Sequence, residues 1–114
     1  KGDGLILWAQ EVQIIHNLVR GMTPSPGAYT YFLKNDSPEK KRTLILKTQI
    51  HDTKKTKPAL NPGIIVDIAP CGIHVATTDG FICVTQLQPE GKRVMDVQEY
   101  LRGHKITDGD MFVS

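Results

Sequence analysis

This sequence of 114 residues has few of the features that mark several large classes of protein. It contains two cysteines, Cys71 and Cys83, whose spacing matches no common pattern of metal ligands, so the sequence predicts no metal site. No apolar run approaches the roughly 18 residues that a membrane-spanning helix needs, and we expect no contact with a membrane. The predicted strands place the two cysteines apart and disfavour a disulfide, so we expect two buried thiols in a cytoplasmic protein.

Side-chain arrangements that would support catalysis are also lacking. His51 and Asp52 are neighbours on a predicted strand, where successive side chains point to opposite faces. Asp108 and Asp110 flank a glycine in a predicted turn, and the turn accounts for them. Aromatic residues make up only 6% of the chain, which argues against a surface built mainly on base stacking. We therefore expect a binding module that carries out no catalysis itself.

The charge of the chain is unevenly distributed along its length. The formal net charge is +2, and a chain of this size is expected to form one domain. Residues 34–57 contain eight Lys and Arg residues against three Asp and Glu residues, whereas residues 58–114 contain four against seven. A basic middle section suggests a polyanionic partner, although such a run can equally form a solvated face.

Hydrophobic periodicity predicts a helix near the start of the chain, over residues 8–20. Its apolar stripe consists of Trp8, Val12, Ile15 and Val19. Gly21 is expected at the C-terminus of this helix, in a left-handed conformation. Pro24 and Pro26 prevent the helix from continuing, so the segment up to Tyr29 forms a rigid corner that leads into a sheet.

Alternating hydrophobicity predicts short strands in the rest of the chain. They cover residues 28–33, 43–51, 63–69, 73–77, 81–87 and 111–113, and a short helix is expected over residues 97–102. The Asp79-Gly80 turn predicts a hairpin, in a register that places Cys83 opposite Ala76 and leaves Cys71 beyond its end. In that register His74 pairs with Thr85 as a solvated strand residue.

These elements indicate the class of fold. Short strands, long polar loops and no second helical layer predict a mainly β domain: a small, partly open β-barrel similar to the OB-fold, with an N-terminal helix and one short helix near the C-terminus. The chain begins with Lys1 and has no initiator Met, which is typical of a piece of a longer protein. We therefore expect residues 1–7 to be the end of an interdomain linker and residues 8–114 to form the domain.

Basic side chains are the strongest candidates for a binding surface. They occur in three sets: Lys40, Lys41 and Arg42; Lys54, Lys55 and Lys57; and Lys92 and Arg93. The first two sets flank the predicted strand 43–51, and the third follows the predicted hairpin. If the barrel brings the sets to one side, they form a surface that follows nucleic-acid phosphates. Recognition of a structured RNA by shape and phosphates is then favoured over base stacking.

Several blocks of sequence, in order and without a large gap, resemble the C-terminal domain of methionyl-tRNA formyltransferases. The first is residues 16–30, HNLVRGMTPSPGAYT, and the others are residues 61–66, 75–84, 87–95, 96–103 and 109–112. Together they extend over about residues 5–113. Ser25 departs from the family pattern, which commonly has an aromatic residue between the two prolines.

The resemblance implies a function for the protein from which the chain derives. Members of this family transfer a formyl group from 10-formyltetrahydrofolate to methionine on initiator tRNA, in an N-terminal Rossmann-like catalytic domain whose motifs do not occur in this chain. The C-terminal domain is an OB-like barrel that offers a positive surface to the tRNA. The resemblance therefore implies a tRNA-binding domain of a translation-initiation enzyme, partnered by its own catalytic domain and binding no cofactor itself.

The family pattern bears unequally on the three basic sets. Lys92 and Arg93 lie inside a matching block, whereas residues 40–42 and 54–57 lie in loops that vary in length within the family. The alternative is a structural or interaction domain of a related formyltransferase that acts on folate or sugar nucleotides and does not bind RNA. A tRNA-binding domain is expected to gather the three sets on one face, whereas a scaffold domain would scatter them.

Overall fold

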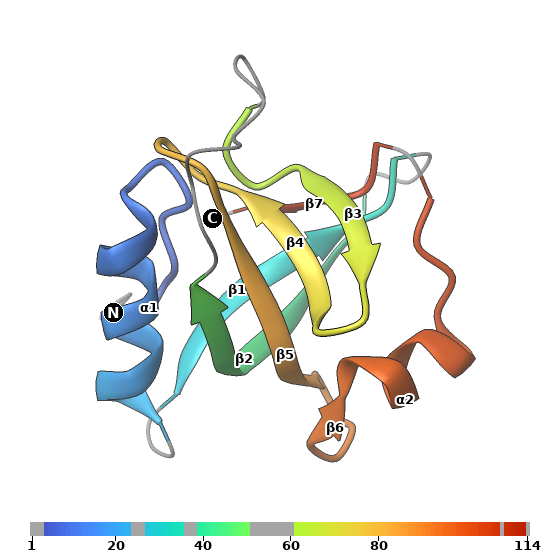
Figure 1. Cartoon of the computed structure of the whole chain (residues 1–114). Coiled ribbons are helices and arrows are strands. Elements are labelled where there is room, and N and C mark those ends of the chain that lie inside the picture. The colour runs from blue at the N-terminus through green and yellow to red at the C-terminus, as the bar shows by residue number, and fades with distance from the viewer. Residues whose placement is uncertain (1–3, 24–26, 36–38, 51–60, 108, 114) are drawn as a thin grey trace.

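The computed structural model describes residues 4–23, 27–35, 39–50, 61–107 and 109–113 (Figure 1). The elements within these ranges are α1 (Val12–Met22), β1 (Ala28–Leu33), β2 (Lys40–Ile50), β3 (Ile65–Ala69), β4 (Gly72–Ala76), β5 (Phe81–Pro89), β6 (Met95–Asp96), α2 (Val97–Gly103) and β7 (Met111–Val113). The predicted class, mainly β with one helix near each end, is confirmed.

The strands form one antiparallel sheet that curls toward a barrel. Their order is β3-β4-β5-β2-β1-β7, with β6 paired to β5. At one end the sheet's two edges meet, because Ile64 bridges Met111 and the Phe112 N–H donates to the Gly63 carbonyl at 2.8 Å. Along the rest of β3 and β7 the described strands do not pair with each other, so the barrel is partly open, as in the OB class.

The core lies between the inner face of the sheet and α1, which runs along one side of it (Figure 1). The predicted stripe of Trp8, Val12, Ile15 and Val19 is buried. The Trp8 ring stacks on Phe112 with 5.6 Å between centroids, and its indole N–H donates to Thr30 Oγ1 at 2.9 Å. Burial of each large apolar side chain contributes about 1.5–3 kcal/mol, so this cluster is a main source of stability.

Both ends of α1 differ from the prediction. The helix begins at Val12 rather than Trp8, because the Val12 N–H donates at 2.9 Å to Asp79 in the β4–β5 turn. Gly21 lies inside the helix and Thr23, in an extended conformation, follows its end. Ile6 is fully buried and its N–H donates to the Tyr29 carbonyl at 2.8 Å. Ile6 therefore packs against β1, and the assignment of residues 1–7 to the end of an interdomain linker stays a prediction.

Two strands carry irregularities that simple alternation does not predict. β2 begins at Lys40, three residues earlier than expected, and irregular pairing with β5 on either side of Lys47 puts both Ile45 and Thr48 inward. In β3 the buried residue is Ile65, whereas Ile68 is 44% exposed. Alternation alone therefore does not define the inner faces of these two strands.

The hairpin between β4 and β5 has a different register from the predicted one. His74 lies opposite Cys83, and Ala76 lies opposite Phe81. The Thr77 N–H donates to the Gly80 carbonyl at 2.8 Å, so the turn is centred on Thr78 and Asp79 rather than on Asp79 and Gly80, and this shifts the pairing by two residues. A two-residue shift leaves every side chain on its predicted face, so Ile73, Val75, Ile82 and Val84 are all buried as expected.

The second helix, α2, lies close to its predicted position. It includes Gly103, which was expected to end it, and His104 follows instead. Asp96 precedes the helix as predicted, but in the part of the chain that the structure describes its carboxylate makes no capping bond; it accepts from Gln86 Nε2 at 3.4 Å. The corner residues 24–26, with Ser25 among them, lie outside the described residues.

Candidate nucleic-acid interface

Two tyrosines and two cations share the outer face of β1 and β2. Along β1 the buried residues alternate with half-buried ones, and Tyr29 and Tyr31 belong to the half-buried, outward set. Tyr31 pairs with Arg42 of β2, and Lys40 lies two residues before Arg42 on the same strand face. Residues that pair directly point to the same side of a sheet, so these four side chains form one surface, here called the tyrosine–cation face.

The geometry of the tyrosine–cation face holds its charges in place. The Arg42 guanidinium carbon lies 4.5 Å from the centre of the Tyr29 ring, and Lys40 Nζ lies 5.6 Å from that of Tyr31. The two rings meet edge to face with 6.0 Å between centroids. A cation over an aromatic ring gains about 0.5–1 kcal/mol at exposed sites. Because Lys40 and Arg42 are exposed, their charges are available to an anion in solvent.

Lys41 does not belong to this face. It pairs with the buried Phe32 and lines a cavity of about 390 Å³ on the other side of the strand pair, together with Tyr100, His104 and Lys105. The three consecutive basic residues are therefore divided between two surfaces. They were predicted to lie in a loop, and their position on a strand is the physical reason for the division.

The β5–β6 turn brings part of the third basic set close to Arg42. The Glu90 N–H donates to the Arg42 carbonyl at 3.0 Å, and the Lys92 N–H donates to the Pro89 carbonyl at the same distance. Lys92 is exposed, whereas Arg93 forms an ion pair with Glu99 of α2. Lys92 therefore adds an exposed charge in a turn whose backbone is bonded to that of Arg42, while the charge of Arg93 is partly offset by a neighbouring carboxylate.

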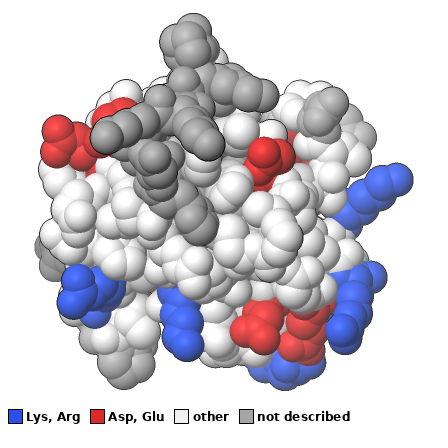
Figure 2. All heavy atoms as spheres, in the orientation of Figure 1, with Lys and Arg blue, Asp and Glu red and all other residues white. Residues whose placement is uncertain are grey.

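Whether all the basic sets share one side remains a prediction. Lys54, Lys55 and Lys57 lie outside the described residues. Figure 2 shows one face of the molecule, on which Lys and Arg side chains lie in separate groups along the lower border and one side. Acidic side chains lie between some of them. On this face the described charges do not form a continuous basic patch, so the tyrosine–cation face is the best-defined candidate surface.

Sequence reasoning missed the importance of the two tyrosines, because the low aromatic content argued against a binding surface built on aromatic residues. Phe32 and Tyr100 are buried, but Tyr29 and Tyr31 are not. The alternation of Tyr and Thr in β1, combined with basic residues on the next strand, is the signal that could have revealed the face.

Sequence reasoning also underestimated Asp110, which is more than a turn residue. Its carboxylate is fully buried and accepts from Lys34 Nζ at 2.8 Å, from the Thr107 N–H at 2.9 Å and from the Asn35 N–H at 2.8 Å. Burial favours the neutral acid, but these donors outweigh it and hold the pKa of Asp110 below its usual value. Lys34 therefore serves to join the end of β1 to the segment before β7.

The fold and the tyrosine–cation face define a small OB-like domain with a basic, aromatic-supported surface. In comparison with known proteins, the family described as "Formyl transferase, C-terminal domain" matches residues 1–105. The chain belongs to this family.

Three curated relatives carry the same name, methionyl-tRNA formyltransferase. The protein of Ruminiclostridium cellulolyticum is 40% identical over 96% of this chain and 33% of its own length. Those of Clostridium tetani and Chlamydia caviae are 39% and 35% identical over 91% of the chain, and 31% and 32% of their own lengths are matched. The chain thus spans about a third of the length of the curated relatives it matches.

No helix among the described residues has the length and apolar character to cross a membrane.

Proposed function

We propose that this chain is the tRNA-binding, C-terminal part of a methionyl-tRNA formyltransferase. The names of the relatives support the parent activity, and the formyl donor of that activity is 10-formyltetrahydrofolate. The chemistry takes place in a catalytic domain outside this chain. This part holds initiator tRNA by its phosphates, so that the acceptor end reaches that domain.

The observation that carries the proposal is the placement of Arg42 over Tyr29. A guanidinium that lies against an aromatic ring still directs N–H groups toward solvent, where phosphate oxygens can accept two of them at once. Lys40 repeats the arrangement over Tyr31. Side chains held in this way lose less conformational freedom when they bind than freely rotating ones.

The same contacts favour recognition of the phosphate backbone of RNA over recognition of its bases. A ring must offer an open face for a base to stack on it. Here a cation already lies over each of the Tyr29 and Tyr31 rings, and the two rings meet edge to face. The face is therefore suited to phosphates of a structured RNA, and Lys92 adds an exposed charge in the turn bonded to the backbone of Arg42.

The test is a titration of the whole chain with initiator tRNA at several salt concentrations. Each phosphate contact that is lost should reduce the slope of log affinity against log salt by about 0.9 on a duplex region. We expect Arg42→Gln to weaken binding and to lower the slope by this amount. Arg102→Gln removes an equal charge from the exposed surface of α2 and serves as the matched control, with no change in slope expected.

The outcomes separate the proposal from the scaffold alternative. If the folded chain does not bind tRNA, or binds it independently of salt, the proposal is wrong and the chain is a structural or interaction domain. An assay of formyl transfer on the isolated chain should give no product. Product formation would show that the chemistry does not reside in a separate domain.

A further inference from the structure

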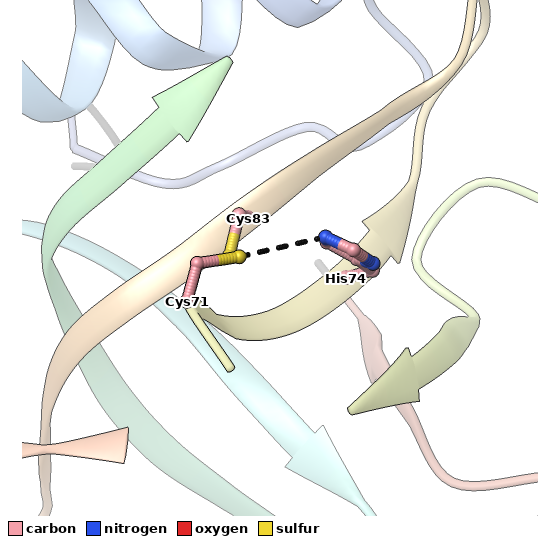
Figure 3. A group of neighbouring side chains, drawn as sticks. All are labelled: Cys71, His74 and Cys83. Atoms are coloured by element: carbon pink, nitrogen blue, oxygen red, sulfur yellow. Dashed lines mark hydrogen bonds between the residues drawn. The ribbon is translucent and has the colours of Figure 1, made fainter. Parts of the chain in front are cut away.

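A group of potential metal ligands lies on the outer side of β4 and β5, and none of them belongs to the tyrosine–cation face. Cys71 stands in the β3–β4 turn, His74 on β4, and Cys83 directly opposite His74 on β5. Cys71 Sγ lies 3.6 Å from His74 Nε2, and the ligand atoms of all three residues lie within 4.8 Å of one another. Figure 3 shows the Cys71 and Cys83 side chains directed toward each other, with the His74 imidazole facing the Cys71 sulfur across a hydrogen bond.

The His74 ring is held in one orientation. Asp67 lies opposite His74 on β3, and its Oδ1 is 2.6 Å from His74 Nδ1, so this nitrogen carries the proton and donates to the carboxylate. The ring also packs against Phe81, with 4.6 Å between centroids. The lone pair of Nε2 is therefore directed toward the two cysteines. Histidines that bind metals in proteins commonly have such a carboxylate behind the ring.

The spacing of the ligand atoms suits a tetrahedral ion. With zinc–sulfur bonds of about 2.3 Å and zinc–nitrogen bonds of about 2.0–2.1 Å, a tetrahedral site has sulfur–nitrogen edges of about 3.6 Å and sulfur–sulfur edges of about 3.8 Å. The Cys71–His74 edge already has this length at 3.6 Å, and no pair exceeds 4.8 Å. Closing the site therefore needs side-chain shifts of about 1 Å or less.

We propose that Cys71, His74 and Cys83 bind a zinc ion, and that Asp67 positions the imidazole. On binding, each thiol loses its proton to solvent and its sulfur forms a bond to the metal, while neutral His74 binds through Nε2. A cleft of about 310 Å³, lined by Cys71, Lys47 and Gln86 among others, leads from Cys71 to solvent. It provides the path of entry and leaves the fourth ligand position for water or an external donor.

The ion would join three neighbouring segments: the β3–β4 turn, β4 and β5. Cys71 belongs to the turn that carries the edge strand β3, whereas Cys83 belongs to β5, near the middle of the sheet. A metal bound between them would hold the β3–β4 hairpin against the rest of the barrel. The inference is independent of tRNA binding, because none of the proposed ligands belongs to the tyrosine–cation face.

The experiment is a titration of the whole chain with Co²⁺ and then with Zn²⁺. A phosphine reductant is present throughout and keeps the cysteines as thiols. We expect one Co²⁺ per chain, with the absorption bands of a tetrahedral thiolate complex, and displacement by Zn²⁺. Zinc should also raise the melting temperature and protect Cys71 from alkylation. A reduced, folded chain that gives no thiolate–cobalt bands would overturn the proposal.

Variants distinguish a specific metal site from adventitious metal binding. His74→Gln and Cys71→Ser should abolish the tetrahedral spectrum, and Asp67→Asn should weaken affinity by about 10–100-fold because the ring loses its support. His104→Gln and Glu90→Gln are the matched controls and should leave affinity unchanged. Because Cys83 is buried, Cys83→Ala requires a circular dichroism check of folding, and Cys71→Ser in the half-exposed turn tests the same prediction without that risk.

Two further results would contradict the metal site. If the chain takes up no metal and its mass falls by two hydrogen atoms when reductant is removed, the cysteines form a disulfide and the group is a redox pair. If metal binds but His74→Gln does not change the spectrum, the ion is held elsewhere. Either result overturns the proposal, whereas loss of the spectrum in both His74→Gln and Cys71→Ser supports it.

Discussion

The Asp79 carboxylate and the Val12 backbone N–H lie 2.9 Å apart, although 67 residues separate them in the sequence. Asp79 occupies the tip of the β4–β5 hairpin, and Val12 is the first residue of α1. The first N–H groups of a helix have no partner within the helix, so an acceptor from another segment can fix where the helix begins. The hairpin turn thus determines the start of α1 and attaches the helix to the barrel.

Asp79→Ala is expected to destabilise the protein through this contact. Loss of a helix-capping carboxylate costs about 1 kcal/mol, which lowers the melting temperature of a domain of this size by about 4 °C. Thermal unfolding followed by circular dichroism provides the measurement. Asp96→Ala is the control, because Asp96 precedes α2 without a side-chain capping bond within the described residues. Equal losses in the two variants would contradict a specific role for Asp79.

Gly21→Ala distinguishes the observed end of α1 from the predicted one. In the structure Gly21 lies within the helix, and no atom lies within 4 Å of the position that a Cβ would take. Alanine should therefore raise the free energy of unfolding by about 0.5–1 kcal/mol. If Gly21 ended the helix in a left-handed conformation, as the sequence suggested, alanine would instead lower it. Urea unfolding gives the sign directly.

Gly63→Ala is expected to have the opposite effect. Gly63 has a φ of 95°, and an added Cβ would meet the carbonyl oxygen of Phe112, where the two edges of the sheet come together. The strained backbone and this clash together should cost about 1–3 kcal/mol. The same urea measurement tests it, and a neutral result would mean that the contact between residue 63 and β7 contributes little to closing the barrel.

The sequence was sufficient for features that depend on local periodicity. The buried stripe of α1, the six residues of β1 and the inward face of the β4–β5 hairpin follow from spacing alone, because each is repeated over several residues. The class of fold followed from the order of these elements. Family membership rested on longer blocks of residues and not on physical reasoning about any single one.

What could not be predicted depends on contacts between distant segments. The start of α1 needs Asp79, and the inner face of β2 depends on irregular pairing near Lys47, which the alternation of a single strand does not reveal. The Cys71, His74 and Cys83 group was missed because the predicted hairpin turn was centred one residue too far along the chain, which offset the register by two residues. In the correct register, the cross-strand pairing of His74 with Cys83 would have revealed it.

Asp110 is expected to make stability depend on pH in the acid range. Burial raises its pKa, but the bonds from Lys34, Thr107 and Asn35 dominate and the folded-state pKa is lowered below the usual 3.8. A lowered folded-state pKa means that the stabilisation is present above the unfolded-state pKa and is lost as the pH falls through the folded-state value. Melting temperatures measured from neutral pH downward should therefore fall most steeply below pH 3.8.

Asp110→Asn tests this assignment. The variant loses the negative charge of the carboxylate, which accepts hydrogen bonds from three donors. Its free energy of unfolding at neutral pH should therefore be lower by about 2 kcal/mol. Its melting temperature should also change less with pH in the acid range, because the titrating group is gone. Glu90→Gln is the control at an exposed position. A variant whose acid dependence equals that of the natural chain would show that other carboxylates cause the acid loss of stability.

Arg42→Lys separates the shape of the Arg42 side chain from its charge. Lysine keeps the positive charge, so the number of neutralised phosphates and the slope of log affinity against log salt should not change. It loses the planar group that lies over Tyr29 and that can donate two parallel hydrogen bonds to one phosphate. Affinity for initiator tRNA should therefore fall several-fold at every salt concentration. Lys40→Arg, at the neighbouring position over Tyr31, is the reciprocal variant and should not weaken binding. If Arg42→Lys binds as tightly as the natural chain, the face acts through charge alone and the tyrosine contact has no part in recognition.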